Sequence, residues 1–184
     1  MKVIIRNLLS KNVICLGELV YGGIDGTITT FAVVAGSVGA GLESRIVVIL
    51  GFANLLADGF AMSIGAYLSS KSMKTETLRQ NKDLSSEKEK TPLLIGLFTY
   101  LSFVIMGIVP LLIYVIDIIA PIGVSLFLCS SIATGLVFII IGTLKALVTK
   151  SNMFRSIIET VALGTIAAVV AYNVGHILEG LVKN

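Results

Sequence analysis

Long apolar runs separated by short polar stretches are the main pattern along this chain. Five apolar segments can be drawn, at about residues 13–40, 46–70, 92–115, 122–144 and 157–181. Each is at or above the ~20 residues that a helix needs to cross the hydrocarbon core of a bilayer. None shows the alternating pattern of an outer-membrane β-strand. The pattern therefore predicts an all-α integral membrane protein with five transmembrane helices.

The segments that flank these runs indicate how the chain is organised. In residues 1–11 apolar positions recur at helical spacing beside Lys2 and Arg6, which predicts a short N-terminal amphipathic helix on the inner leaflet. The turn at 41–45 is short, so the first two spans should be antiparallel neighbours that share a face. Pro110 predicts a kink inside the third span. We expect one domain, residues 1–184, with a charged linker at 71–91 that begins as a helical extension.

Composition and charge fix the class and the expected orientation. Hydrophobic residues make up 55% of the chain and charged residues 14%, well below the quarter typical of soluble domains. With the N-terminus inside, all Lys and Arg residues except Arg45 and Lys183 lie on the cytoplasmic side. Cytoplasmic loops retain positive charge, so we expect a cytoplasmic N-terminus and an external C-terminus, in the inner membrane if the chain is prokaryotic. The net charge of +3 thus reflects topology and gives no reason to expect nucleic-acid binding.

The first apolar segment contains features that are unusual for a membrane span. Glu18 and Asp25 lie within it, although a carboxylate near the bilayer centre costs roughly 2.5–3.5 kcal/mol before it finds a partner. The apolar run and these acids argue against a cleaved signal peptide. Gly22 and Gly26 have the spacing of a close helix contact. Gly22 and Gly23 also permit a local break that would free backbone carbonyls as ligands.

Asp25 and Asp58 are predicted to lie at the same depth. Each is 12 residues from the inner edge of its span, which corresponds to roughly 18 Å at 1.5 Å per residue. Asn54 and Met62 are one turn on either side of Asp58 and share its face. Together with Glu18 near the cytosol, these side chains form a ladder of candidate metal ligands: Glu18, Met62, Asp25, Asp58 and Asn54.

Two carboxylates at this depth either stay protonated or ionise together around a cation. Binding one divalent ion would release up to two protons, so metal and protons would move in opposite directions. The thioether of Met62 favours first-row transition metals over Mg²⁺ and Ca²⁺. Fe²⁺, Mn²⁺ and Co²⁺ are therefore the expected substrates, Zn²⁺ less so, and no cofactor is expected.

Each of these residues also has a purely structural interpretation. Asp25 and Asp58 would then hydrogen-bond two helices together, and Met62 would pack in the core. Asn54 would join helices and Glu18 would be solvated. The remaining polar and thiol groups are expected to be structural: Glu159, His176, the linker acids Glu76, Asp83, Glu87 and Glu89, and the apolar-packed Cys15 and Cys129.

Two other functional classes compete with transport. Facing aspartates in a bilayer also occur in intramembrane aspartyl proteases, where they share a proton and activate water. The stretch before Asp25 lacks the Gly-x-Gly-Asp arrangement of those enzymes, and Met62 and Asn54 would have no catalytic role. A non-transporting membrane scaffold is the third possibility, and it would tolerate neutralisation of the acids.

Two motifs resemble the vacuolar iron transporter family. Residues 17–30 read GELVYGGIDGTITT and residues 51–72 read GFANLLADGFAMSIGAYLSSKS, and weaker similarity covers nearly the whole chain. The resemblance implies a five-span homodimer that carries Fe²⁺, and often Mn²⁺, out of the cytosol in exchange for protons. It places Asp25 and Met62 at the family's intramembrane metal positions, with Glu18, Asn54 and Asp58 alongside. The family's long cytoplasmic metal-binding domain is replaced here by residues 71–91.

Overall fold

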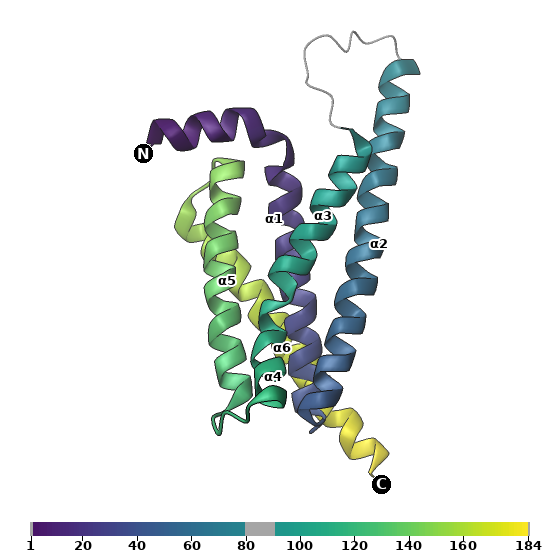
Figure 1. Cartoon of the computed structure of the whole chain (residues 1–184), viewed down its shortest axis with the longest axis vertical. Helices are drawn as coiled ribbons and strands as arrows, with labels where there is room; N and C mark the ends of the chain where they lie inside the picture. Colours follow the sequence, from purple (N-terminus) through teal and green to yellow (C-terminus); the bar gives the residue numbers. More distant parts are fainter. Residues whose placement is uncertain (1, 80–90, 184) are drawn as a thin grey trace.

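The computed structural model describes residues 2–79 and 91–183, with side chains from Leu16 onward except at 77 and 78. These residues form helices joined by turns and short loops (Figure 1). The helices are α1 (Lys2–Gly39), α2 (Ser44–Arg79), α3 (Pro92–Gly107), α4 (Val109–Ile119), α5 (Leu126–Thr149) and α6 (Met153–Val182). Of the predicted linker, residues 71–79 continue α2, whereas Asp83, Glu87 and Glu89 lie outside the described residues.

The helices confirm an all-α integral membrane protein. Within the described ranges, four segments are long and apolar enough to cross a bilayer: Leu16–Gly39, Ser44–Glu76, Leu126–Thr149 and Met153–Val182. Helices α3 and α4 together make a fifth, bent by 49°. The five-span prediction therefore holds when this bent pair is counted as one crossing.

The bend in the third span lies where the proline predicted a kink. Pro110 is the second residue of α4, a position that tolerates the missing N–H, whereas inside a continuous helix its ring would clash with the preceding turn. Ser130 on α5 donates a hydrogen bond of 2.7 Å to the Pro110 carbonyl. The span continues to Ile119, beyond the predicted end at residue 115.

Two helices begin at residues other than those predicted, and local turn chemistry explains the difference. The fourth span begins at Leu126 rather than at 122, because Gly123 adopts a positive φ of 58° in the loop that follows Pro121. The fifth begins at Met153 rather than at 157, since the Asn152 side chain caps the helix by accepting from the Phe154 N–H at 3.0 Å.

Helix α1 runs as one element from Lys2 to Gly39, and this bears on two expectations. The predicted N-terminal helix forms the first part of α1, and its side chains lie outside the described residues. The break that Gly22 and Gly23 permit does not occur, because the helix hydrogen bonds are not interrupted there. The Thr27 hydroxyl also donates a 2.7 Å bond to the Gly23 carbonyl.

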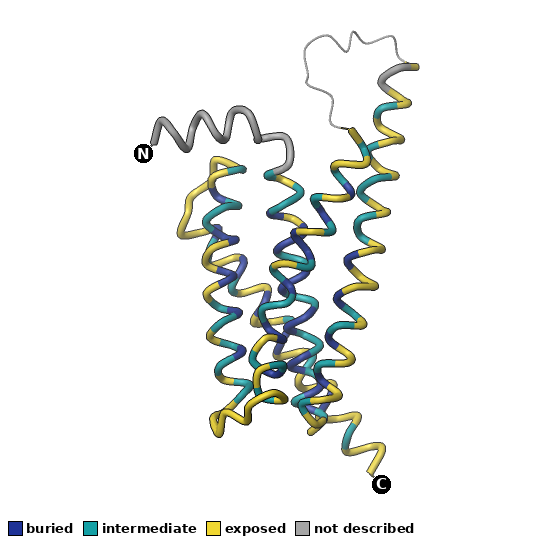
Figure 2. Tube along the Cα trace, viewed as in Figure 1, coloured by how far each residue is buried: buried dark blue, intermediate teal, exposed yellow. Residues whose placement is uncertain are grey.

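Helix α1 lies at the centre of the bundle and packs most extensively against α3 and α6 (Figure 1). Helix α3 also packs along α2, and α5 packs on α6. The α1–α2 turn is tight, with Gly41 at a φ of 64°, so the two helices run antiparallel as predicted. Buried positions concentrate where these helices meet, while exposed positions follow their outer sides (Figure 2).

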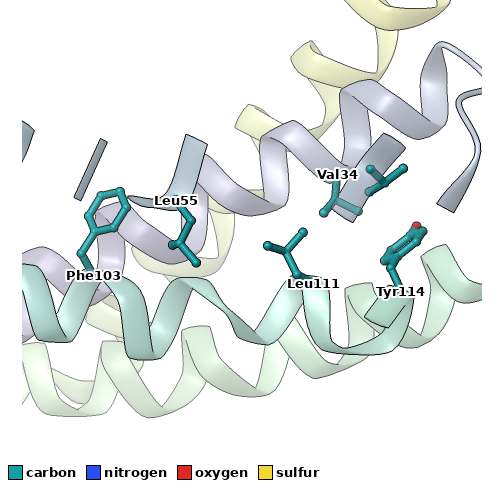
Figure 3. Packing of buried hydrophobic residues seen from close by; sticks show 6 residues of the cluster. Val34, Leu55, Phe103, Leu111 and Tyr114 are labelled. Carbon is teal, nitrogen blue, oxygen red and sulfur yellow. The ribbon is translucent and has the colours of Figure 1, made fainter. Parts of the chain in front are cut away.

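One buried cluster joins α1, α2, α3 and α4 (Figure 3). It contains Val34, Val47, Leu55, Phe103, Leu111 and Tyr114. The cluster combines aliphatic and aromatic side chains from both halves of the bent span, so the bend keeps α3 and α4 in contact with the first two helices.

Candidate metal site

Asp25 of α1 and Asp58 of α2 lie at the same level of the bundle, because the residues that follow them, Gly26 and Gly59, both pack against Phe103 of α3. Asp25 is half-buried on α1 and Asp58 is exposed on α2, whereas the next residue in each helix, Gly26 or Gly59, is buried against α3. The two carboxyl groups therefore lie beside the packed α1–α2–α3 junction rather than inside it.

The other predicted ligands lie on the same two helices as Asp25 and Asp58. Asn54 is half-buried one turn from Asp58, and Glu18 is half-buried two turns before Asp25. Met62 is half-buried and packs against the core cluster of Figure 3. Its thioether thus contributes to packing in this conformation, and its role as a ligand remains a prediction.

The described residues contain no group of three or more His, Cys, Asp and Glu side chains that could hold a metal ion. A cation here would have two carboxylates as anionic ligands. Neutral ligands would come from the Asn54 amide oxygen, the Met62 sulfur and water. Such a small charged set suits an ion that must be bound and released, whereas closed structural sites supply more protein ligands.

Backbone carbonyls around Asp25 are already engaged. The Thr27 hydroxyl donates to the Gly23 carbonyl, and the Thr29 hydroxyl donates to the Asp25 carbonyl at 2.8 Å. These bonds occur within an unbroken helix, so the carbonyl ligands expected from a helix break are not available in this conformation.

Sequence reasoning missed the residues of α3 that hold the first two helices in place. Ser102 donates a hydrogen bond to the Leu19 carbonyl of α1, and Ser63 of α2 donates one of 2.8 Å to the Gly96 carbonyl of α3. Serine within an apolar span was the only indication of such bonds. The contacts of Phe103 and Gly107 with both neighbours had no indication in the sequence.

Glu159 forms ion pairs near a helix end, as its structural interpretation predicted. Glu159 of α6 pairs with Lys145 of α5 at 3.1 Å and with Arg155 at 3.2 Å. Glu179 pairs with Lys183 at the other end of α6. Cys129 is half-buried and free on α5, whereas the Cys15 side chain lies outside the described set.

A comparison with known protein families matches the part of the chain that contains the candidate site. The profile of the VIT family matches residues 16–85 and 73–176. These ranges include all five predicted site residues and reach into every predicted span.

Individual relatives match to different extents. A vacuolar iron transporter of Toxoplasma gondii is 40% identical over 74 residues, which is 40% of this chain and 24% of the relative. One of Plasmodium falciparum is 36% identical over 77 residues, 42% of this chain and 28% of the relative. Vacuolar iron transporter homolog 4 of Arabidopsis thaliana is 27% identical over 170 residues, 89% of this chain and 83% of the relative. The aligned part is therefore about a quarter of the first two relatives.

Proposed function

Because the chain belongs to the VIT family, we propose that it is a membrane transporter that moves a divalent transition metal out of the cytosol. The relatives are named as iron transporters, which supports Fe²⁺ as a substrate; Mn²⁺ is proposed on the chemistry of the site. Transporter names also favour this function over the intramembrane protease.

The observation that carries the proposal is the placement of Asp25 and Asp58 at one level on two bilayer-length helices, where Gly26 and Gly59 pack on the same Phe103. Two carboxyl groups at one level of a bilayer are stabilised by a cation or by protons. A structural pair would instead share a hydrogen bond, or each group would have a basic partner. The pair is therefore best explained as an ion-binding site.

Exchange with protons follows from the same pair. When a divalent ion leaves, the two carboxylates lose its compensating charge, and protonation restores neutrality. When metal binds again, those protons must leave. We propose that one metal ion and up to two protons move in opposite directions.

We further propose that two copies of the chain assemble as a homodimer. Asp58 is exposed on α2 within a segment that spans the bilayer, and lipid contact would cost roughly 2.5–3.5 kcal/mol for a carboxylate. Apolar Phe60 and Ile64 are exposed on the same helix. A second copy that covers α2 would remove Asp58 from lipid and place its carboxyl group in a protein-lined path.

Reconstitution into liposomes tests the transport proposal. Purified protein is assayed with Fe²⁺ under reducing conditions, and with Mn²⁺, Co²⁺, Zn²⁺ and Mg²⁺, while a pH dye reports on the lumen. We expect flux of Fe²⁺ and Mn²⁺ with opposite proton movement and negligible Mg²⁺ flux. Absence of any metal-dependent flux from folded protein would overturn the proposal.

Crosslinking tests the dimer. In a background with Cys15 and Cys129 replaced by Ala, Ala57→Cys introduces one thiol on the exposed side of α2. A short bismaleimide should convert it into a dimer in native membranes. Leu136→Cys on the exposed side of α5 is the matched control and should remain monomeric. Equal crosslinking at both positions would argue against an α2 interface.

A further inference from the structure

Phe103 of α3 contacts both helices that carry the aspartates. It is fully buried. A Cβ atom built at Gly26, directly after Asp25, would lie 2.3 Å from the Phe103 carbonyl oxygen. A Cβ atom built at Gly59, directly after Asp58, would lie 3.0 Å from Cδ1 of the Phe103 ring. One residue of α3 therefore separates α1 from α2 at the level of the carboxyl pair.

Gly107 makes the corresponding contacts one turn further along α3. A Cβ atom there would lie 2.7 Å from the Gly26 carbonyl oxygen and 2.6 Å from Cδ1 of Leu55. Leu55 directly follows Asn54 on α2. Gly107 is also the last residue of α3 before the 49° bend, so the axis of the span changes direction directly after this contact.

We propose that Phe103 and Gly107 are positioning residues that set the spacing between α1 and α2 and thereby the size of ion that fits between Asp25 and Asp58. The proposal rests on the proposed transport function. Helix interfaces are packed as densely as organic crystals, so a change of volume at the contact moves the helices that touch it. Selection of a cation depends on the size of its site as well as on ligand chemistry.

The two positions predict opposite changes in selectivity. Gly107→Ala adds a methyl group between α1 and α2, so it should widen the site and favour the larger Mn²⁺ over the smaller Co²⁺. Phe103→Leu removes ring volume from the same junction, so it should let the helices approach and favour Co²⁺. Both side chains act through the helices and neither is proposed to touch the metal.

The test measures initial rates of Mn²⁺ and Co²⁺ uptake into liposomes that contain the full-length protein. The ratio of the two rates is independent of the amount of active protein, so a loss of folded protein does not mimic the effect. We expect the Mn²⁺/Co²⁺ ratio to rise at least about threefold in Gly107→Ala and to fall by a similar factor in Phe103→Leu. This change is smaller than the change in discrimination that one methylene group causes in a binding pocket.

Two matched controls distinguish spacing from general destabilisation. Phe31→Leu removes the same volume from a buried cluster with Ala35 and Ala168. Gly135→Ala adds a methyl group where no atom lies within 4 Å. Both should keep the wild-type ratio.

The outcomes separate this inference from the transport proposal. If wild-type protein transports metal but the Phe103 variant keeps the ratio of the Phe31 variant, the inference is wrong and transport stands. The same conclusion follows if both test variants shift the ratio in one direction. If Gly107→Ala does not fold, the Phe103 and Phe31 variants decide alone. If wild-type protein carries neither ion, both proposals fail.

Discussion

At the scale of single residues, the consequential feature is a pair of like charges in an apolar setting. Asp25 and Asp58 lie at one level on α1 and α2, and Asp58 is exposed on its helix. The residues that follow them are glycines packed on α3, so the backbone positions of both acids are tightly constrained. The chemistry of the pair should therefore respond to removal of one charge without a change of fold.

Asp25→Asn and Asp58→Asn test this expectation. Each keeps the side-chain shape but removes a charge that the metal needs and a proton that the counter-flow needs. We expect metal flux to fall about 10–100-fold or more. Metal sites lose affinity or activity by this factor even when the mutated residue only hydrogen-bonds to a ligand. Proton movement should be lost together with metal flux in the same liposome assay.

The linker acids provide the control for this prediction. Joint replacement of Glu76, Asp83, Glu87 and Glu89 by Gln should lower flux by less than about twofold, since isolated exposed charges contribute little. An inactive linker variant beside an active aspartate variant would move the capture site to the linker and refute the intramembrane assignment.

Met62→Leu separates ligand from packing at the third candidate position. Met62 packs on the core cluster, and Leu fills a similar volume at a cost below about 1.5 kcal/mol. If the sulfur binds metal, Fe²⁺ flux should fall while the thermal midpoint in detergent stays close to the wild-type value. Unchanged relative rates for Fe²⁺ and Mn²⁺ would assign Met62 to packing alone.

At the scale of helices, close backbone approach holds the bundle together. Helix α1 meets α3 at Gly26 and meets α6 at Gly36, where a Cβ atom on Gly175 would lie 2.0 Å from the Gly36 carbonyl oxygen. Small residues allow such contact, which matters in lipid because burial of apolar surface does not drive helices together there.

Gly175→Ala tests how much the α1–α6 contact contributes. The added methyl group meets backbone atoms that cannot rotate away, so we expect a loss of about 1–3 kcal/mol in stability. Gly180→Ala on the same helix is the control, because a Cβ there meets no atom within 4 Å and alanine favours helix by up to about 1 kcal/mol. Thermal unfolding in detergent should rank Gly180→Ala at or above wild type and Gly175→Ala clearly below it.

At the scale of the whole molecule, charge is divided between the two ends of the bundle. Lys71, Lys74 and Arg79 end α2 at the same end as the α5–α6 connection with its basic residues (Figure 1). Arg45 follows the α1–α2 turn at the opposite end, and Lys183 follows α6 there. This division supports the proposed orientation, because cytoplasmic ends retain positive charge.

Cysteine labelling tests this orientation. In the same Cys-free background, Thr75→Cys should react with an impermeant maleimide only after the membrane is permeabilised. Val124→Cys, in the exposed loop between α4 and α5, should react in intact cells. Labelling of position 75 in intact cells would reverse the topology and the direction of transport.

The sequence alone determined the features that a bilayer imposes locally. A spanning segment must satisfy its backbone within a helix, so length and apolarity were enough to predict five all-α crossings. Pro110 predicted the kink by its missing N–H. The rise per residue and a short turn were enough to predict that Asp25 and Asp58 lie at the same depth. Their candidate roles rested on the cost of carboxyl groups in lipid.

Only the tertiary structure decided which helix faces meet. In lipid the inner and outer faces of a span are both apolar, so periodicity does not reveal which side is buried. The insertion of α3 between α1 and α2, with Phe103 and Gly107 behind the two aspartates, depends on side-chain shapes from distant segments. The same is true of Met62, whose packing on the core follows from the neighbours that the bend in the third span supplies.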